Sequence, residues 1–375
     1  MLVTRMKRLL SAMTGALAML FANGASAEYG LNLPRGVTPI SQEAYNLHML
    51  IFWLCVAIAV VVFGAMFISI IKHRKSKGAV ASQFHESTTV EILWTVVPFL
   101  ILVGMAIPAT KALVNMEDTS NSDLSIKVTG YQWKWGYEYI DDDISFISSL
   151  STPHDQIYNL ADKGENYLLE VDNPLVVPVN KKVRLLITAN DVIHAWWVPQ
   201  LGMKKDAIPG FINAIWIKVE KEGTYRGQCA ELCGKDHGFM PIVVVAKNDA
   251  DYAQWVSDQK SAADADVAAA GKAWVKADLV ARGEKVYKAN CAACHQANGE
   301  GVPGAFPAIK GSAIATGPAA GHVSIVMNGK SGTAMASFAG QLNDIDIAAV
   351  ITYQRNSLGN NTGDLVQPSD VKAAR

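Results

Sequence analysis

Residues Cys229-Ala-Glu-Leu-Cys-Gly-Lys-Asp-His-Gly-Phe-Met240 are the stretch on which the rest of the chain depends. They place two thiols, an imidazole and a thioether within one short segment. A further imidazole, His194, lies upstream in Asp191-Val-Ile-His-Ala-Trp-Trp197. Cysteine and methionine are soft donors and histidine is a borderline one. The combined set therefore suits copper better than magnesium or calcium.

A single blue-copper centre takes two histidines, one cysteine and a weak methionine. The second cysteine of this segment therefore needs another explanation. The simplest use of Cys229 and Cys233 is as two thiolates that bridge two copper ions. His194 and His237 then cap one ion each, with Met240 on one copper and a backbone carbonyl on the other. Two alternatives stay open. The cysteines could form a disulfide in an oxidising compartment, or the cysteines and histidines could bind zinc, although methionine is a poor zinc ligand.

The pattern Cys-x-Glu-x-Cys-x-x-x-His-x-x-Met resembles the dicopper (CuA) loop of subunit II of cytochrome c oxidase. Asp191-Val-Ile-His-Ala-Trp-Trp-Val-Pro199 and Leu201-Gly-Met-Lys-Lys-Asp-Ala-Ile-Pro-Gly210 resemble that family's first-ligand segment. Gly130-Tyr-Gln-Trp-Lys-Trp-Gly-Tyr-Glu-Tyr139 is similar to its aromatic strand. Together these motifs cover residues 40–248. The resemblance implies a cupredoxin-like sandwich that carries a dicopper centre.

The resemblance also implies roles for three further residues. The backbone carbonyl of Glu231 completes a copper site, and its side chain reaches a magnesium ion at the junction with subunit I. Trp133 occupies the position of the family's exposed electron-input tryptophan. Glu91 lies at the mouth of a proton channel into subunit I. Each residue also has a simpler interpretation. Glu231 is then a surface carboxylate, and Trp133 is a ring packed on a sheet face. Glu91 is then an acid at a helix N-terminus, favoured by the helix dipole.

The composition bounds the class of protein. The chain has 375 residues, of which 50% are hydrophobic and 18% charged, with a formal net charge of −1. This length suits two or three domains. No basic excess points to nucleic acid.

Residues 1–27 read as a secretory signal peptide. They combine a positive segment at residues 5–8, a short apolar run at residues 9–21 and the small-residue cleavage site Ala25-Ser-Ala27. A signal anchor is the alternative, but the apolar run is short. The mature chain is then expected to begin at Glu28.

Residues 28–115 are expected to form a membrane hairpin. Two apolar runs, at about 47–71 and 90–114, exceed the ~17 residues that a membrane span needs; a buried core helix of a soluble protein is the alternative. The basic loop Lys72-His-Arg-Lys-Ser-Lys77 between them is expected in the cytoplasm. Both ends of the mature chain then face the periplasm of a bacterial inner membrane.

Residues 116–248 are expected to be a copper-binding β-domain. Alternating apolar and polar residues predict strands at 124–129, 183–188 and 211–220. Many short strands without helices indicate a Greek-key sandwich or barrel. Asp141-Asp-Asp143 is interpreted as a solvated turn in preference to a docking patch for a basic cytochrome.

Residues 277–360 are expected to form an all-α cytochrome c domain, joined by a partly helical linker at 249–276. Cys291-Ala-Ala-Cys-His295 has the sequence that attaches haem covalently through Cys291 and Cys294, with His295 as proximal iron ligand. A redox pair or a chance match is the alternative. The surrounding sequence resembles class I cytochromes c, with helices at 278–290 and 345–358 that pack together.

Met335 is the expected distal haem ligand. The family usually has Met-Pro here, and Ala336 replaces the proline. Met327 and His322 are the rival ligands; Met327 is interpreted in preference as a core residue and His322 as a surface or core residue. The carbonyl of Pro307 is expected to accept the His295 imidazole proton. The tail at 361–375 is expected to be disordered.

These features indicate subunit II of a haem–copper cytochrome c oxidase with a fused cytochrome c domain. Its expected partners are subunits I and III and an external cytochrome c or other respiratory donor, and it takes part in proton translocation. A quinol-oxidase subunit II lacks the copper ligands, and a nitrous oxide reductase needs a propeller domain. A copper carrier has no use for covalent haem.

Overall fold

The computed structural model describes residues 32–80, 83 and 85–375. The expected signal peptide lies outside the described residues. By their contacts, residues Gly36–Arg375 belong to one unit, which contains the whole of the architecture described below.

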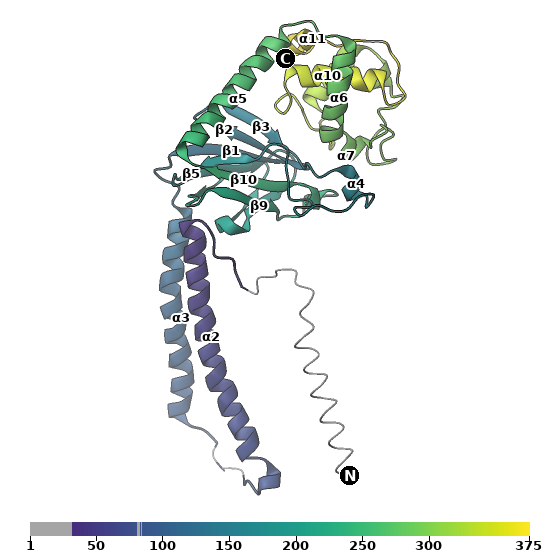
Figure 1. The fold of residues 1–375 in the computed structure, drawn as a ribbon. Coiled ribbons are helices and arrows are strands. Elements are labelled where there is room, and N and C mark those ends of the chain that lie inside the picture. The colour runs from purple at the N-terminus through teal and green to yellow at the C-terminus, as the bar shows by residue number, and fades with distance from the viewer. Residues whose placement is uncertain (1–31, 81–82, 84) are drawn as a thin grey trace. The chain divides into compact units, whose positions relative to one another are not determined.

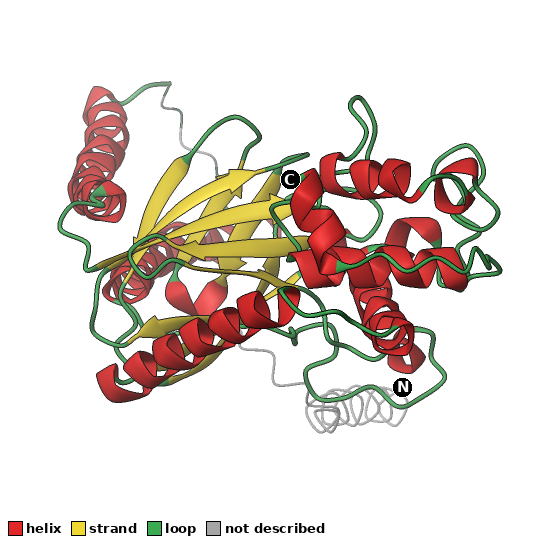
Figure 2. Ribbon diagram, turned by 90° about the horizontal axis from the view of Figure 1, so that it is seen from above, coloured by secondary structure: helices red, strands yellow, loops and turns green. Residues whose placement is uncertain are grey.

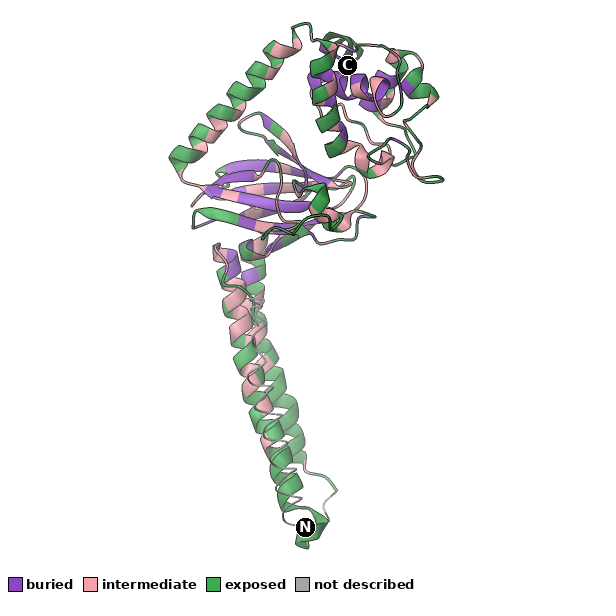
Figure 3. Cartoon of the chain, turned by 45° about the vertical axis from the view of Figure 1, so that its right-hand side comes forward, coloured by how far each residue is buried: buried purple, intermediate pink, exposed green. Residues whose placement is uncertain are grey.

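Two long helices, α2 (Pro39–Lys72) and α3 (Thr88–Glu117), contact each other and contain the expected spans (Figures 1 and 3). A short 3-10 turn, η1 (Lys75–Lys77), lies in the basic connection. Both helices are long and apolar enough to cross a membrane. Val61 and Ile107 are each 69% exposed. Because extended apolar surfaces on a protein mark contact with lipid or with another protein, these helices form the two-pass membrane anchor.

Ten short strands form the β-domain as two five-stranded sheets. One sheet has the order β3-β2-β1-β5-β8 and the other β4-β10-β9-β6-β7. The pairs β1–β5 and β4–β10 are parallel, and the remaining strand pairs are antiparallel. The strands are β1 (Leu124–Tyr131), β2 (Lys134–Tyr139), β3 (Ile144–Ser148), β4 (Leu175–Pro178), β5 (Val183–Ala189), β6 (His194–Val198), β7 (Met203–Ala207), β8 (Asn213–Ile217), β9 (Gly223–Cys229) and β10 (Pro241–Lys247).

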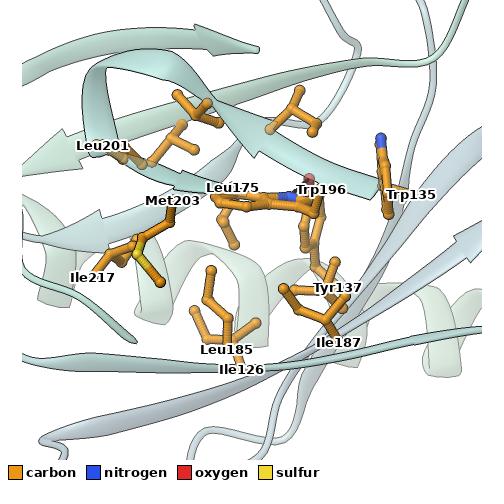
Figure 4. Packing of buried hydrophobic residues seen from close by; sticks show 14 of the residues in the cluster. Ile126, Trp135, Tyr137, Leu175, Leu185, Ile187, Trp196, Leu201, Met203 and Ile217 are labelled. Carbon is orange, nitrogen blue, oxygen red and sulfur yellow. Dashed lines mark hydrogen bonds between the residues drawn. The ribbon is translucent and has the colours of Figure 1, made fainter. Parts of the chain in front are cut away.

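The core of this sandwich follows from period-two patterning. In β5, buried and half-buried residues alternate from Val183 to Ala189, so one face of the strand points inward. Leu185 and Ile187 meet Trp196 and Leu175 of the opposite sheet in a single buried cluster (Figure 4). The packed sheets are a rigid support for the loops at their ends (Figure 2), as the expected cupredoxin-like sandwich requires.

The aromatic segment at 130–139 is a hairpin, and its interpretation as one strand is wrong. Gln132 and Trp133 form the turn between β1 and β2, so Tyr131 pairs with Lys134. Trp135 and the tyrosines at 137 and 139 are buried, as expected for a packed sheet face. Trp133 is instead carried on the turn. The acidic segment Asp141-Asp-Asp143 is a turn between β2 and β3, as predicted.

The C-terminal region is helical, and α10 packs against α6 as predicted. Gly283 makes this approach feasible, since a Cβ atom there would lie 2.0 Å from the Ala349 carbonyl oxygen. The helices after the sandwich are α5 (Asp249–Ala270), α6 (Lys276–Asn290), α7 (Ala292–His295), α8 (Ala313–Thr316), α9 (Ala319–Asn328), α10 (Asp344–Asn356) and α11 (Pro368–Ala374). Within the β-domain lie the short turns α4 (His154–Ile157), η2 (Pro199–Leu201) and η3 (His237–Phe239).

Two segments are more ordered than the sequence predicted. Most of the expected linker is helix α5, whose Trp255 ring lies 5.1 Å from the Tyr139 ring of the sandwich. The expected disordered tail is wrong: it contains α11, and Val366 and Val371 are buried in the cytochrome-like core. Two apolar residues spaced along a polar tail were too weak a signal for sequence patterning to detect.

Candidate metal centres

The two thiols of the predicted copper loop face each other at the end of the sandwich. Cys229 ends β9 and Cys233 lies in the following loop, and both are buried. Their Sγ atoms are 3.8 Å apart. A disulfide requires about 2.05 Å, and both cysteines are free. The disulfide alternative therefore does not describe this site.

Four other donors surround the thiols. His194 Nδ1 lies 4.0 Å from Cys229 Sγ, and His237 Nδ1 lies 3.5 Å from Cys233 Sγ. The Met240 sulfur is 3.5 Å from Cys233 Sγ. The carbonyl oxygen of Glu231 is 3.3 Å from Cys229 Sγ. All predicted copper ligands are thus brought together by two segments, the start of β6 and the loop between β9 and β10.

This donor set fits two soft ions better than one zinc. A structural zinc site takes four ligands in a tetrahedron, whereas two thiolates, two imidazoles, a thioether and a carbonyl converge here. The ligand atoms of His194, Cys229 and Cys233 all lie within 4.8 Å of one another. A pair of sulfurs at this separation can bridge two ions, and thioether and thiolate ligands select copper. The residues therefore fit a dicopper centre.

Hydrogen bonds around the site change the pKa values of the donor groups. The thiol of Cys233 donates to Cys229, and this contact lowers the pKa of Cys229 to about 3 and raises the pKa of Cys233. Burial alone would lower the pKa of His194, but hydrogen bonds with Asp191 and Cys229 outweigh it and raise that pKa. Since a metal binds thiolate and neutral imidazole, binding releases the protons that these contacts retain.

Asp191 holds the ligand segment in place, a role that sequence patterning did not reveal. Its Oδ1 lies 2.9 Å from His194 Nε2, and its Oδ2 accepts a hydrogen bond from the Gln132 backbone at 2.8 Å. One carboxylate thus orients a predicted copper ligand and fixes the turn that carries Trp133. An acid three residues before a ligand histidine is the signal that could have revealed it.

Trp133 contacts the copper loop directly. Its indole Nε1 donates a 3.2 Å hydrogen bond to the carbonyl oxygen of Cys233, and Gln132 Nε2 donates to the same oxygen at 2.8 Å. A Cβ atom on Gly234 would lie 3.2 Å from the Trp133 ring. The partly buried indole is therefore packed against a residue that adjoins a predicted copper ligand.

The haem-attachment motif forms a separate site in the helical region. Cys291 directly follows α6, and Cys294 and His295 lie on α7. His295 Nδ1 lies 2.8 Å from the carbonyl oxygen of Pro307, which confirms the predicted partner. Burial lowers the pKa of His295, which favours the neutral imidazole that binds iron. Two free thiols beside an oriented imidazole fit a covalently attached haem.

The rivals of Met335 are engaged in the core. Met327 is only 3% exposed, in a cluster between α9 and α10. His322 is equally buried, and its Nε2 lies 2.8 Å from Gln354 Oε1. Met327 was predicted to be a core residue and His322 a surface or core residue, and both lie in the core. Met335 lies partly buried in the loop after α9 and stays the predicted distal ligand.

The two predicted carboxylates outside the copper site lie on the surface of the described chain. Glu91 is in the first turn of α3. The side chain of Glu231 is exposed while its carbonyl faces Cys229. Surface positions are available to another subunit.

Comparison with known proteins assigns each region. Residues 26–112 match the family model "Cytochrome C oxidase subunit II, transmembrane domain", and residues 124–247 match "Cytochrome C oxidase subunit II, periplasmic domain". A probable cytochrome c oxidase subunit 2 of Rickettsia bellii is 41% identical over 60% of this chain and 82% of its own length. This chain belongs to the cytochrome c oxidase subunit 2 family.

Other known proteins are also similar to parts of this chain. The cytochrome c oxidase subunit 2 of Arabidopsis thaliana is 40% identical over 63% of this chain and 91% of its own length. The crystal structure of the periplasmic domain of cytochrome oxidase subunit II from Bradyrhizobium japonicum is 45% identical, with a TM-score of 0.35, over 38% of this chain and 97% of that one. Residues 278–353 match a model described as "Cytochrome C oxidase, cbb3-type, subunit III". This member of the subunit 2 family therefore carries an additional cytochrome c-like region.

Proposed function

We propose that this subunit receives electrons at its own covalent haem and delivers them through a dicopper centre to subunit I of a haem–copper oxidase. The observation that carries the proposal is the convergence of four further donors, two imidazoles, a thioether and a backbone carbonyl, around two unjoined sulfurs 3.8 Å apart. The haem and the dicopper centre each supply one-electron transfer when bound. Oxygen reduction belongs to subunit I, so this chain makes no bonds to oxygen.

The proposed copper ligands keep their positions whether or not an electron is present. His194 and Cys229 lie at the ends of packed strands, and the other ligands lie in the short loop that joins β9 to β10, so the sandwich holds the ligand geometry at both ends of that loop. Asp191 fixes the ring of His194, and the hydrogen bonds of Gln132 and Trp133 fix the carbonyl of Cys233. A site that does not rearrange lowers the cost of each electron transfer.

Trp133 is the proposed electron-input residue. Its hydrogen bond to the Cys233 carbonyl connects an aromatic ring to the backbone of a copper ligand. Proposed haem ligation uses Cys291 and Cys294 as thioethers, with His295 and Met335 on the iron. External cytochrome c or another respiratory donor is proposed to reduce this haem.

Two proposed roles face subunit I. The exposed carboxylate of Glu231 is suited to a magnesium ion at that junction, because magnesium prefers carboxylate oxygens. Glu91, in the first turn of a membrane helix, is the proposed mouth of a proton channel. Association with subunit III belongs to the same proposal.

Metal analysis of the purified oxidase tests the copper and haem assignments together. The measurement is copper and covalent haem per chain in the wild type and in Cys233→Ser, with the haem-motif variant Cys294→Ser as the matched control. We expect Cys233→Ser to lose the dicopper near-infrared absorption and keep covalent haem, and Cys294→Ser to do the reverse. Retention of the near-infrared absorption in Cys233→Ser would disprove bridging by two thiolates.

A further inference from the structure

Lys134 is an unusually buried cation next to the proposed electron-input residue. It begins β2, directly after Trp133, and its side chain is almost completely buried, at 6% exposure. Lysines are almost never buried to this degree unless their charge is paired. An ammonium group in such a place needs partners that replace water.

Within the described chain, the hydrogen-bond and cation–π partners of the Lys134 ammonium belong to the cytochrome region, whereas Asp172 and Asp191 of the copper domain attract it electrostatically. Its Nζ donates a 2.7 Å hydrogen bond to Asn290 Oδ1. The same Nζ lies 4.8 Å from the centroid of the Phe338 ring, within the range of a cation–π contact. Asn290 is the last residue of α6 and immediately precedes the first haem-attachment cysteine, Cys291.

A second lysine makes a similar contact from the copper loop itself. Lys235 follows Cys233 by two positions, and its Nζ donates a 3.2 Å hydrogen bond to the carbonyl oxygen of Ala293. Ala293 lies between the two haem-attachment cysteines. Lysines that flank Trp133 and Cys233 therefore both reach polar acceptors that flank or lie within the haem motif.

We propose that the cytochrome region docks on the copper domain through one specific surface, in which Asn290 and Phe338 receive Lys134 and the carbonyl of Ala293 receives Lys235. The partner of the copper loop is thus the chain's own haem motif. This inference rests on the proposed function for its purpose, but the surface itself is defined by contacts alone. An external donor then meets the haem region, while the surface beside Trp133 belongs to the docked domain.

The buried lysine makes the docking selective. Burial lowers the pKa of Lys134 to about 8, which shows that covering the ammonium has a cost. A covering surface without an acceptor leaves the ammonium without this hydrogen bond, and burying a charged group that lacks hydrogen-bond partners is costly. Surfaces that lack an acceptor at this position are therefore rejected. Asn290 is the residue that supplies it.

Amine labelling of the purified full-length oxidase tests the docked surface without using electron transfer. Lys134 and Lys127 lie on the two strands of one hairpin, and the Lys127 side chain is 42% exposed. With a short acylating reagent at pH 7 and mass-spectrometric readout, we expect Lys134 to react at least about tenfold more slowly than Lys127. Equal reactivity of the two lysines in the wild type overturns the proposal.

Asn290→Leu removes the acceptor and keeps the approximate size of the side chain. Since a hydrogen bond to a charged group is worth about a factor of ten or more in an equilibrium, we expect Lys134 to become labelled about tenfold faster. Asn290→Asp, which keeps an acceptor, should preserve protection. Asn298→Leu is the matched control, because this asparagine of the same region bonds only to Glu300 in the described contacts.

Covalent haem content, measured on each variant, shows that the cytochrome region has folded. Unchanged protection of Lys134 in haem-loaded Asn290→Leu overturns the docking surface. The rate at which the reduced haem is oxidised by the copper centre is measured separately on the same samples. The labelling of Lys134 tests the docking surface, and the rate of haem oxidation tests the proposed electron route. A failure of the docking proposal is therefore distinguishable from a failure of the proposed function.

Discussion

At the scale of single residues, a proposed copper ligand is held by a neighbour that is not itself a proposed ligand. Asp191 contacts both His194 and the backbone of Gln132. Loss of such an outer partner typically reduces metal affinity by about 10- to 100-fold, because the ligand ring is no longer held in orientation. We therefore expect Asp191→Asn to retain copper about 10- to 100-fold less tightly.

Competition with a copper chelator, followed by near-infrared absorption of the purified oxidase, measures this affinity. Asp143→Asn is the control, since this exposed aspartate lies in the turn between β2 and β3. Copper retention equal to that of the wild type would show that the contact with Asp191 is not needed to hold His194.

His322 gives the cytochrome region a dependence on acid. Burial lowers its pKa from 6.5 to about 4, although the hydrogen bond with Gln354 opposes this shift. Between these values the unfolded chain binds a proton that the folded chain does not. Stability is therefore complete above pH 6.5 and is lost as pH falls toward 4, by up to about 3 kcal/mol.

Thermal or denaturant unfolding between pH 7 and pH 4, followed by haem circular dichroism, measures this loss. His322→Gln can still donate to Gln354 but cannot titrate, so we expect its stability to fall less steeply with acid. His154→Gln, an exposed histidine of the β-domain, serves as the control. Parallel curves for the wild type and His322→Gln would rule out the buried histidine as the source.

Sequence was most informative about single residues, because the chemistry of a side chain can be read directly from the sequence. The convergence of His194, Cys229, Cys233, His237 and Met240 could be predicted because thiols, imidazoles and a thioether gathered in this way are typical of copper sites, and their role as copper ligands stays a prediction. The contact of His295 with Pro307 was predicted and is present. Asp191 and Lys134 could not be found in this way, since their importance comes from partners that are distant in sequence.

At the scale of elements, long apolar runs and alternating strands could be predicted, whereas turns and amphipathic helices were less certain. The hairpin at 130–139 resembles one strand in sequence because its aromatic alternation continues through Gln132 and Trp133. Helix α5 resembles a linker because its alanines and charges are typical of a flexible segment. Only the packing of Tyr252 and Trp255 on the sheet shows what its rare apolar residues do.

Trp255 is expected to anchor the first half of α5. Its ring lies 5.1 Å from Tyr139, 6.3 Å from Phe146 and 5.8 Å from Tyr252. Replacing it with alanine removes most of the apolar area that holds this helix to the sheet, a loss of about 2 kcal/mol. We expect Trp255→Ala to increase amide hydrogen exchange at residues 249–260.

The exchange is measured by mass spectrometry on the intact oxidase. Gln254→Ala, at an exposed position of the same turn, should leave the exchange unchanged. If Trp255→Ala also left residues 249–260 protected, helix propensity and the Asn248 cap would suffice to hold the segment.

At the scale of the whole molecule, the residues of the proposed electron route and those of the membrane anchor belong to different parts of the chain. The proposed electron residues lie in the sandwich and the helical region, whereas Glu91 lies in α3. A change at Glu91 should therefore leave the metal centres intact. This separation allows electron input and proton uptake to be measured independently in a single variant.

Glu91→Gln removes the titrating carboxyl while keeping its size. A positioned proton-transfer group commonly contributes a factor of about 100 or more, so we expect oxygen consumption to slow at least about tenfold. Haem reduction and the dicopper spectrum should match the wild type. Glu86→Gln, in the exposed segment before α3, is the matched control. Normal oxygen consumption in Glu91→Gln would leave this carboxylate as a helix N-terminal residue only, stabilised by the helix dipole.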